Sequence, residues 1–316
     1  ALGVPQEEDD ATTQVVVASA GVGPADENNK RGPSVEFADV SLRYRPGLPL
    51  VLDGVSFAVA GGTRVGVVGR TGSGKSTTML ALFRLVPLAA GRVVVDGQDI
   101  AALPLAELRR RITIIPQDPV LFVGTVRSNL DPFEQQTDER LEAALAEVGL
   151  TGRLGSEGLR AAVNAKGSNF SVGQRQLLCL ARALLRRSPV LLLDEATASV
   201  DGETDGLIQR TIRSAFKGST VLVIAHRLAT VMDSDQIVVL RDGRVEEAGA
   251  PSELLAKEGG AFAEMVAAQG KASVPDADPT NTSNPRSMSS LSSSGSLQEL
   301  ELDEIPSQLS IRDRSP

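Results

Sequence analysis

The sequence predicts an α/β fold with a mostly parallel sheet, an antiparallel β layer before it and a helical insertion within it. Three observations support this prediction. Short apolar runs typical of buried strands alternate with segments of helical periodicity through the middle of the chain. Residues that alternate between apolar and polar near the start are typical of half-buried strands. A long, mainly helical stretch then separates two of the buried strands.

The first half of the chain contains most of the expected strands. SVEFADVSLRY (34–44) and GVSFAVA (54–60) have the alternating pattern, and Gly61-Gly62 is expected to be a turn. RVGVVG (64–69) is expected to be a buried strand leading into a glycine-rich loop, with a helix from about Lys75. Further along come a strand in GRVVVDGQDI that ends in an Asp-Gly turn, a short helix in PLAELRRR and a strand in ITIIP.

The second half is expected to be mostly helical over residues 125–187, with LEAALAEVGL and QRQLLCLARALLRR as its main helices. The sheet resumes in VLLLDE and VLVIAH, which a helix separates. A hairpin, DQIVVLRDGRVEEAG, and a terminal helix near 251–269 follow.

Composition divides the 316 residues into three parts. Residues 1–33 are expected to be a disordered linker with at most a short strand, and 34–270 a folded domain with a helical subdomain at about 120–187. Residues 271–316 form a serine-rich and then acidic tail, which cannot bury enough apolar surface to repay ordering. Most of the net charge of -8 lies in the two ends, so the folded domain is nearly neutral.

This composition excludes several classes of protein. A near-neutral domain without a basic stripe argues against a nucleic-acid partner. The single cysteine, Cys179, rules out an internal disulfide framework and a cysteine-rich zinc site. A helix that spans a bilayer needs about 18 or more consecutive apolar residues, and no stretch of this sequence approaches that length. Any membrane helices of the system are therefore expected to lie outside this chain.

A phosphate-binding loop is the clearest chemical motif. Residues 69–76, GRTGSGKS, match G-x-x-x-x-G-K-[ST] between a buried strand and a helix, which predicts a P-loop NTPase core. Glycines allow backbone N–H groups to surround phosphate oxygens, and the helix N-terminus adds its positive dipole end. Lys75 is expected to reach the β and γ phosphates, and the hydroxyl of Ser76 is expected to bind Mg²⁺.

Two acids end the buried strand PVLLLDE. Asp194 stands at the carboxyl end of that strand, where parallel sheets bind ligands, and is expected to hold Mg²⁺. Glu195 is expected to position and deprotonate the water that attacks the γ-phosphate. The alternative is a pair of surface acids that close a strand.

Seven motifs in order then resemble the nucleotide-binding domain of ATP-binding cassette (ABC) proteins over about residues 34–270. In addition to the phosphate loop and DE, NFSVGQRQ resembles the signature motif, IIPQDP the Q-loop, SVD the D-loop and IAHR the switch loop, while Tyr44 resembles the aromatic residue that faces adenine. The resemblance implies ATP as ligand, Mg²⁺ as cofactor and an ATPase activity. It implies ATP contacts from Tyr44, Gly69, Thr71, Gly72, Ser73, Gly74, Lys75, Ser76, Thr77 and Gln117, with Gln117 also contributing to the metal site alongside Ser76 and Asp194.

The signature segment predicts a second anion site. Ser171 and Gly173 begin a helix, so their N–H groups and the Ser171 hydroxyl are expected to form this site. One domain has no use for two such sites on one nucleotide. The family resemblance implies that two domains pair head to tail, so that each signature helix covers the ATP held by the other. The implied contacts to the partner's ATP come from Ser171, Val172, Gly173, Gln174 and Asp201.

Finer details resemble the second cassette of the C subfamily, the multidrug-resistance-associated transporters. RYRPGLPLVL, TIIPQDPVLFVGTVRSNLDPF and DEATASVD carry this likeness, together with Val172 and an intact Glu195. The implied function is to power export from the cytosolic face of a membrane, with transmembrane domains and a second nucleotide-binding domain as partners. In such transporters the two ATP sites are unequal, and this cassette would supply the competent phosphate-binding and catalytic motifs.

Two departures and two alternatives remain open. Ala165 stands where exporters usually carry an acid, and RGPSVEF lacks the usual Trp-Pro before the first strand. A soluble ABC ATPase that acts on ribosomes or DNA is disfavoured, since the chain has no second cassette, coiled-coil arm or basic surface. A nucleotide sensor that gates a channel is poorly distinguished, because such proteins can keep every motif.

The only histidine, His226, follows the apolar run VLVIA at the end of an expected core strand. A metal site is disfavoured because no second histidine exists. On its own, a structural histidine would be the simpler interpretation. The resemblance implies that His226 is the switch histidine, which hydrogen-bonds the γ-phosphate and helps to fix the attacking water.

Overall fold

The computed structural model describes residues 32–194, 200–225 and 227–272. The chain divides into two units, 1–274 and 275–316, and every described residue belongs to the first. The linker and tail expected at 1–33 and 271–316 lie almost wholly outside the described residues, so these boundaries stay predictions. Gly32 and Pro33 are described and contact the domain: the Gly32 amide donates to the Gly218 carbonyl at 2.6 Å, and the Pro33 carbonyl accepts from the Thr220 hydroxyl at 2.6 Å.

An antiparallel sheet opens the described chain, as the alternating residues predict. Its strand order is β2-β1-β4-β5, and its strands are β1 (Val35–Leu42), β2 (Leu52–Val59), β4 (Ala90–Val95) and β5 (Gln98–Asp99). The rings of Phe37 and Phe57 stack across the β1–β2 pair, with their centroids 4.5 Å apart. The inward residues of β1 are buried and the alternate ones partly exposed, which is the pattern of a sheet with one covered face.

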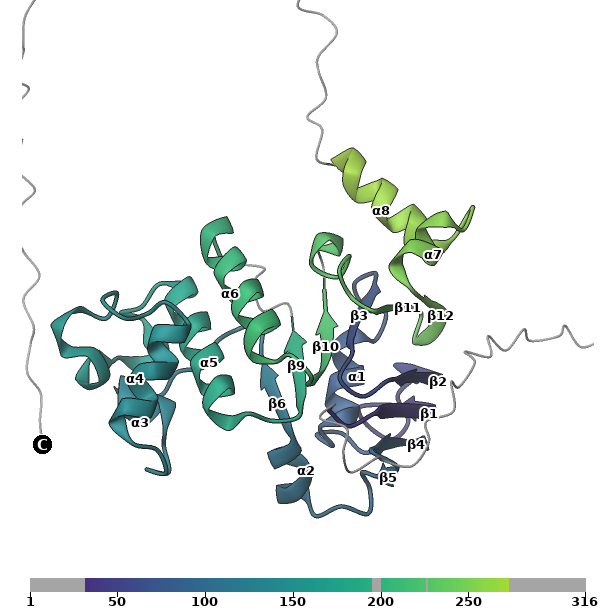
Figure 1. The fold of residues 1–316 in the computed structure, drawn as a ribbon. Helices are drawn as coiled ribbons and strands as arrows, with labels where there is room; N and C mark the ends of the chain where they lie inside the picture. Colours follow the sequence, from purple (N-terminus) through teal and green to yellow (C-terminus); the bar gives the residue numbers. More distant parts are fainter. Residues whose placement is uncertain (1–31, 195–199, 226, 273–316) are drawn as a thin grey trace, which may run out of the picture. The chain divides into compact units, whose positions relative to one another are not determined.

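The second sheet has the order β12-β11-β3-β10-β9-β6 and carries the chemistry (Figure 1). Five of its strands run parallel, and β12 returns antiparallel to β11 as the expected hairpin. The strands are β3 (Arg64–Gly69), β6 (Ile112–Ile115), β9 (Val190–Asp194), β10 (Thr220–Ile224), β11 (Gln236–Arg241) and β12 (Arg244–Gly249). Asp194 and Val67 both align with Ile224 of β10, so the carboxyl ends of β3 and β9 lie at the same edge, with β3 extending two residues further.

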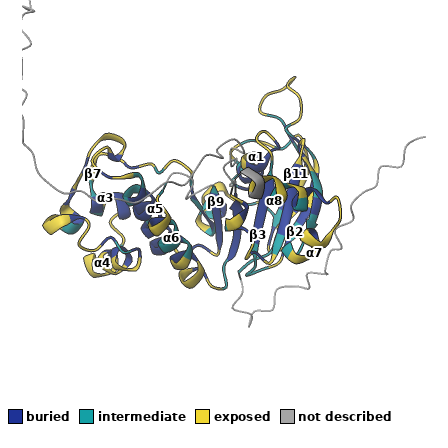
Figure 2. Ribbon diagram, turned by 90° about the horizontal axis from the view of Figure 1, so that it is seen from above, coloured by how far each residue is buried: buried dark blue, intermediate teal, exposed yellow. Residues whose placement is uncertain are grey.

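Both faces of this sheet are covered, as Figure 2 shows for the buried strands β3 and β9. Successive side chains of a strand point to opposite faces. Val67 accordingly packs in one apolar cluster with the antiparallel sheet and α1 (Lys75–Leu82), whereas its neighbour Val68 packs in the other cluster with the remaining helices. This double burial explains why the strand sequences are continuous apolar runs.

The helical region is less helical than its sequence predicts. Between residues 125 and 187 the α-helices are α3 (Val126–Leu130), α4 (Asp138–Glu147) and α5 (Val172–Arg186), which contact one another. The rest consists of loops, two short 3₁₀ turns, η1 (Gly155–Arg160) and η2 (Ala165–Gly167), and the two-residue strands β7 (Gly124–Thr125) and β8 (Ala162–Val163). The expectation of a mostly helical segment was wrong because five glycines after α4 adopt positive φ, which ends or prevents helix: Gly149, Gly152, Gly155, Gly158 and Gly167.

The remaining helices flank the sheets. They are α2 (Leu105–Arg111), α6 (Gly202–Ala215), the 3₁₀ turn η3 (Leu228–Thr230), α7 (Pro251–Ala256) and α8 (Ala261–Ala272). The single terminal helix expected near 251–269 is two helices, since Gly259-Gly260 separates α7 from α8. Glu247 fixes this junction: its buried carboxylate accepts from Lys257 Nζ at 2.9 Å and from the Phe262 amide at 3.1 Å.

Candidate nucleotide-binding site

The phosphate loop lies where the sequence predicts, between β3 and α1. The backbone explains two of its glycines. Gly69 has φ +155, and a Cβ there would lie 2.3 Å from the Leu240 carbonyl oxygen. Gly74 has φ +100, and a Cβ there would lie 2.7 Å from Leu52 Cδ2. A larger residue at either position would push the loop away from the strands that shape it.

The residues of this loop fit a phosphate ligand. Gly74 is the N-cap of α1 and offers no side chain to its first turn, so the N–H groups there are left for a ligand. Ser73 is 4% exposed, and in the described part of the chain its Oγ has no hydrogen-bond partner. Lys75 is 6% exposed, and its ammonium donates to the Gly69 and Arg70 carbonyls at 2.8 and 3.0 Å. Both side chains therefore belong to the loop where phosphate oxygens are expected.

Tyr44 stands beside the same helix. Its hydroxyl is 2.8 Å from the hydroxyl of Thr77 on α1, and 49% of the residue is exposed. The hydrogen bond holds the ring near the phosphate loop, while the exposed ring area remains available to a base. This placement is compatible with the predicted stacking on adenine, which stays a prediction.

The predicted metal-binding residues lie at the carboxyl edge of the parallel sheet. Ser76 is exposed on the first turn of α1, Asp194 ends β9, and Gln117 is exposed just after β6. No group of three His, Cys, Asp or Glu side chains in the described ranges could hold a metal. One carboxylate with a hydroxyl, an amide oxygen and phosphate oxygens is nevertheless a donor set that suits Mg²⁺, which commonly takes only one or two carboxylates from the protein.

Glu195 and His226, the two predicted catalytic residues, lie outside the described residues. Their neighbours in the sequence are described: Asp194 precedes Glu195, and Ala225 precedes His226. The Ala225 amide donates to the Val67 carbonyl of β3 at 3.3 Å. The described residues Asp194 and Ala225 thus lie at the edge of the sheet that carries the phosphate loop.

The signature motif opens α5, as predicted, through a capping box. Ser171 Oγ accepts from the Gln174 amide at 3.1 Å, and the Ser171 amide donates to Gln174 Oε1 at 2.9 Å. The Ser171 amide is therefore engaged within the chain, contrary to the expectation that it adds to an anion site. The Ser171 hydroxyl proton and the first-turn amides of Val172 and Gly173 remain as the donors of such a site.

The helix that follows the D-loop, α6, packs against the signature helix α5. Asp201 caps α6, because its carboxylate accepts from the Thr204 amide at 2.9 Å and from the Thr204 hydroxyl at 2.8 Å. These two bonds hold the pKa of Asp201 below its ordinary value. A Cβ on Gly173 would lie 3.2 Å from Thr204 Cγ2, so the two motifs meet at Thr204. Contact of Asp201 with a partner's ATP stays a prediction, and its role within the chain is that of a helix cap.

Sequence reasoning missed three polar residues that connect these motifs. Gln176 on α5 donates to the Pro116 and Gln117 carbonyls at 3.0 and 3.3 Å, which ties the signature helix to the Q-loop backbone. Arg182 on α5 and Asn129 on α3 form a second connection, described below. The sequence did offer a signal for Gln176, which is a polar residue on the apolar face of a helix. Gln176 is only 2% exposed, and a buried polar side chain needs a hydrogen-bond partner.

A pocket of about 560 Å³ opens on the β11 side of the phosphate loop. The loop residues 69–73 form one wall, and α8 and the end of β11 form the others. Its lining does not include Tyr44, Lys75 or Asp194, so it is not the site where the nucleotide contacts converge.

Comparison with known proteins agrees with this geometry. The family described as "ABC transporter" matches residues 52–198. The chain is 51% identical over 235 residues to "ABC transporter C family MRP4" of Zea mays and 51% identical over 231 residues to "ATP-binding cassette sub-family C member 2" of Rattus norvegicus. These alignments cover 74% and 72% of this chain but only 16% and 15% of the relatives.

A solved structure, "Structure of a bacterial Atm1-family ABC exporter with ATP bound", is also similar. The TM-score is 0.71 and the sequence identity 37%, over 78% of this chain and 44% of that chain. The sequence of this chain is about 50% identical to those of C-subfamily members over most of its length. The motifs, the sheet order and both kinds of comparison lead to one assignment. The chain carries the nucleotide-binding domain of the ABC transporter family, which is the ATPase domain of that family.

Proposed function

We propose that this domain binds ATP with Mg²⁺, hydrolyses it in a head-to-tail pair with a second nucleotide-binding domain, and thereby drives export by a C-subfamily transporter. The observation that carries the pairing is the separation of two phosphate-binding ends in one chain. The phosphate loop follows β3, whereas the signature helix α5 packs against β6, three strand spacings or about 14 Å away in the sheet. The two phosphate-binding ends thus belong to different strands of the sheet, which supports separate ATP contacts.

In the proposed pair, each residue has a defined role. The first-turn amides of α1 and Lys75 bind the phosphates of one ATP, and Tyr44 stacks on its adenine. Ser76, Gln117 and Asp194 hold Mg²⁺, which neutralises phosphate charge. The signature helix supplies Ser171 and the first-turn amides to the ATP on the partner domain, so ATP joins the two domains until it is hydrolysed.

Glu195 and His226 carry the proposed chemistry. Glu195 orients the attacking water and takes its proton, and His226 donates a hydrogen bond to the γ-phosphate. His226 follows β10, which pairs with β3, and Glu195 follows β9, the next strand along, which supports this assignment. As the second cassette of its subfamily, the domain would supply the more active of two unequal ATP sites.

The transmembrane partner is supported by an exposed apolar surface, which we call the docking patch: Val120, Phe122 and Val123. Their exposed fractions are 56%, 66% and 74%. Monomeric proteins rarely expose clustered large apolar residues without a partner. The loop that contains Ala165 lies beside this patch, because β8 pairs with β7 at Gly124–Val163. No helix in the described ranges is long and apolar enough to cross a membrane, so the spanning helices would come from elsewhere in the transporter, with this domain on the cytosolic face.

The test uses the chain with and without the Glu195→Gln change. The variant is expected to keep ATP affinity, to form an ATP-dependent dimer in analytical ultracentrifugation and to lose turnover. His226→Ala should also bind ATP and lose most turnover. Hydrolysis by wild-type protein should rise with protein concentration or with added partner domain, because the site is shared. Glu195→Gln turning over at the wild-type rate, or wild-type turnover independent of concentration and of partner, would refute the proposal.

One alternative keeps a physical basis. A nucleotide sensor would show the same ATP-dependent dimer but would gate its partner when ATP binds, without needing turnover. Transport or gating that persists in the Glu195→Gln variant would favour the sensor over the exporter.

A further inference from the structure

Arg182, in the C-terminal half of α5, makes three short hydrogen bonds to one neighbouring segment. Its Nε donates to the Asn129 carbonyl at 2.5 Å, its Nη2 to Asn129 Oδ1 at 2.6 Å and its Nη1 to the Val120 carbonyl at 2.6 Å. Burial lowers the pKa of this guanidinium, yet arginine stays charged in proteins. A charge withdrawn from water needs good acceptors, and these three oxygens supply them.

Asn129, on α3, extends the connection to the segment that bears the docking patch. It is 3% exposed. Its Oδ1 accepts from the Phe122 amide at 2.9 Å, and its Nδ2 donates to the Phe122 and Thr125 carbonyls at 2.8 and 2.9 Å. Asn129 thus pairs with both backbone groups of Phe122, as a neighbouring strand would. The Arg182 guanidinium also lies over the Phe122 ring, 5.9 Å from its centroid.

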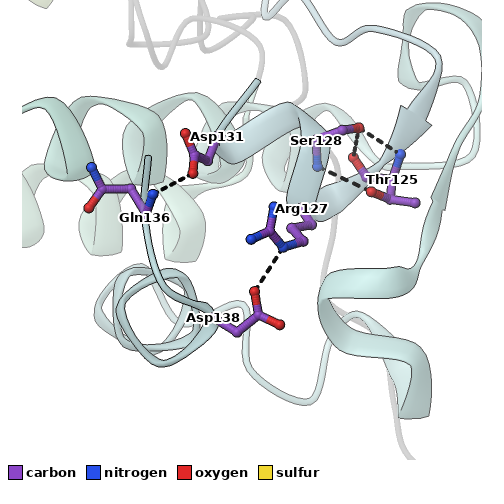
Figure 3. A network of polar contacts seen from close by, with 6 residues as sticks. All are labelled: Thr125, Arg127, Ser128, Asp131, Gln136 and Asp138. Carbon is purple, nitrogen blue, oxygen red and sulfur yellow. Dashed lines mark hydrogen bonds and ion pairs between the residues drawn. The ribbon is translucent and has the colours of Figure 1, made fainter. Parts of the chain in front are cut away.

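The segment is also anchored where it enters α3. Figure 3 shows the capping box, in which Thr125 Oγ1 accepts from the Ser128 amide and Ser128 Oγ accepts from the Thr125 amide, at 3.1 and 2.9 Å. Two further contacts in the same view hold α3 to the start of α4: Arg127 to Asp138 at 2.8 Å and the Gln136 amide to Asp131 at 2.6 Å. Hydrogen bonds therefore join residues 120–131 to one another, and Arg182 joins this segment to α5.

We propose that Arg182 and Asn129 are positioning residues that transmit movement between the membrane domains and the signature helix. A domain seated on Phe122 would move residues 120–125, and the Arg182–Asn129 bonds would move α5 with them. This inference rests on the proposed function and deepens it. The path leads to the helix that covers the partner's ATP, and the bonds described for Arg182 and Asn129 do not involve the chain's own phosphate loop. Breaking the Arg182–Asn129 bonds should therefore uncouple the membrane domains from the signature helix and leave ATP binding intact.

The first test measures coupling in the full-length transporter. Nitroxide labels on the two membrane domains report the distance change caused by a non-hydrolysable ATP analogue. In Arg182→Gln the analogue is expected to bind with wild-type affinity while the distance change is lost, and Arg182→Lys should keep part of it. Arg186→Gln is the matched control, because Arg186 lies on the same helix but donates to the Arg109 carbonyl. A full distance change in Arg182→Gln, or a parallel loss of analogue affinity, would overturn the proposal.

The second test uses hydrogen exchange in the 316-residue chain to measure whether the Arg182 and Asn129 bonds hold residues 120–125 in place. The amides of residues 120–125 are expected to exchange faster in Arg182→Lys and in Asn129→Leu, with β9 and β10 unchanged. This test remains valid if Arg182→Gln does not fold, because Arg182→Lys keeps the charge. Unchanged exchange in residues 120–125 would show that these bonds do not hold the segment. A wild-type transporter without any distance change would instead refute the proposed function, so the two failures are distinguishable.

Discussion

The phosphate loop offers a paired test of how its shape is determined. Gly69 and Gly72 both have positive φ, +155 and +83, and both belong to the predicted ATP site. They differ in their surroundings. A Cβ on Gly69 would lie 2.3 Å from the Leu240 carbonyl oxygen and 2.5 Å from Ser73 Oγ, whereas a Cβ on Gly72 would meet nothing within 4 Å. Substitution by alanine therefore separates the cost of the backbone angle from the cost of the close contact.

The expected magnitudes follow from these two terms. A left-handed backbone costs a non-glycine residue about 1–2 kcal/mol, and both variants incur this cost. Forcing a methyl group into a filled space adds roughly 1–3 kcal/mol, which only Gly69→Ala incurs. In a domain of about 240 residues, 1 kcal/mol lowers Tm by about 2–4 °C. Gly69→Ala should therefore melt about 2–12 °C below Gly72→Ala.

The assay is unfolding by heat and by urea without nucleotide, so that ATP affinity does not enter the comparison. Equal urea slopes would show that both variants unfold from similar structures. The reasoning fails if Gly72→Ala is destabilised as much as Gly69→Ala, because the contact with β11 would then contribute nothing.

Two further predictions concern single side chains. Burial raises the pKa of Glu247, but the hydrogen bonds from Lys257 and from the Phe262 amide lower this pKa more. The Glu247 carboxylate therefore stabilises the fold at any pH above its ordinary pKa of 4.5. This stabilisation is lost as the pH falls through the lower pKa of the folded state. Glu247→Gln should therefore cost about 1–3 kcal/mol in urea unfolding at neutral pH. A wild-type advantage that fails to shrink at acidic pH would contradict this. Tyr44→Phe loses only the bond to Thr77 and should weaken ATP binding less than about five-fold. Tyr44→Ala also loses base stacking of about 1–3 kcal/mol and should weaken it much further; wild-type affinity in a titration would exclude the adenine contact.

Local motifs could be located from the sequence because their chemistry depends on neighbouring residues. GRTGSGKS predicts both the loop and the helix after it, and Ser171 with Gln174 three residues on matches the spacing of a capping box. The strands were predictable because a sheet covered on both faces requires continuous apolar runs. Glu195 was assigned from its position after an apolar strand and His226 from the family resemblance, and both lie outside the described residues.

The helical region shows where local reasoning ends. The long apolar helix α5 was predicted, since its buried positions recur with helical spacing. The loops between α4 and α5 were not, because a glycine that reaches positive φ gives no periodic signal of its own. For the same reason the split between α7 and α8 at Gly259 was missed.

The sequence alone determined the family, the strands and the residues that belong to each motif, since these follow from contacts within a few residues. The tertiary structure decided which motifs touch. It placed Thr204 between Gly173 and Asp201, Gln176 against the Q-loop and Arg182 against residues 120–129. The contacts of Gln176 and Arg182 join side chains to backbone groups far away in the sequence, and the contact between Gly173 and Thr204 joins two different helices. The strength of a hydrogen bond depends on a distance and an angle that only the folded chain fixes.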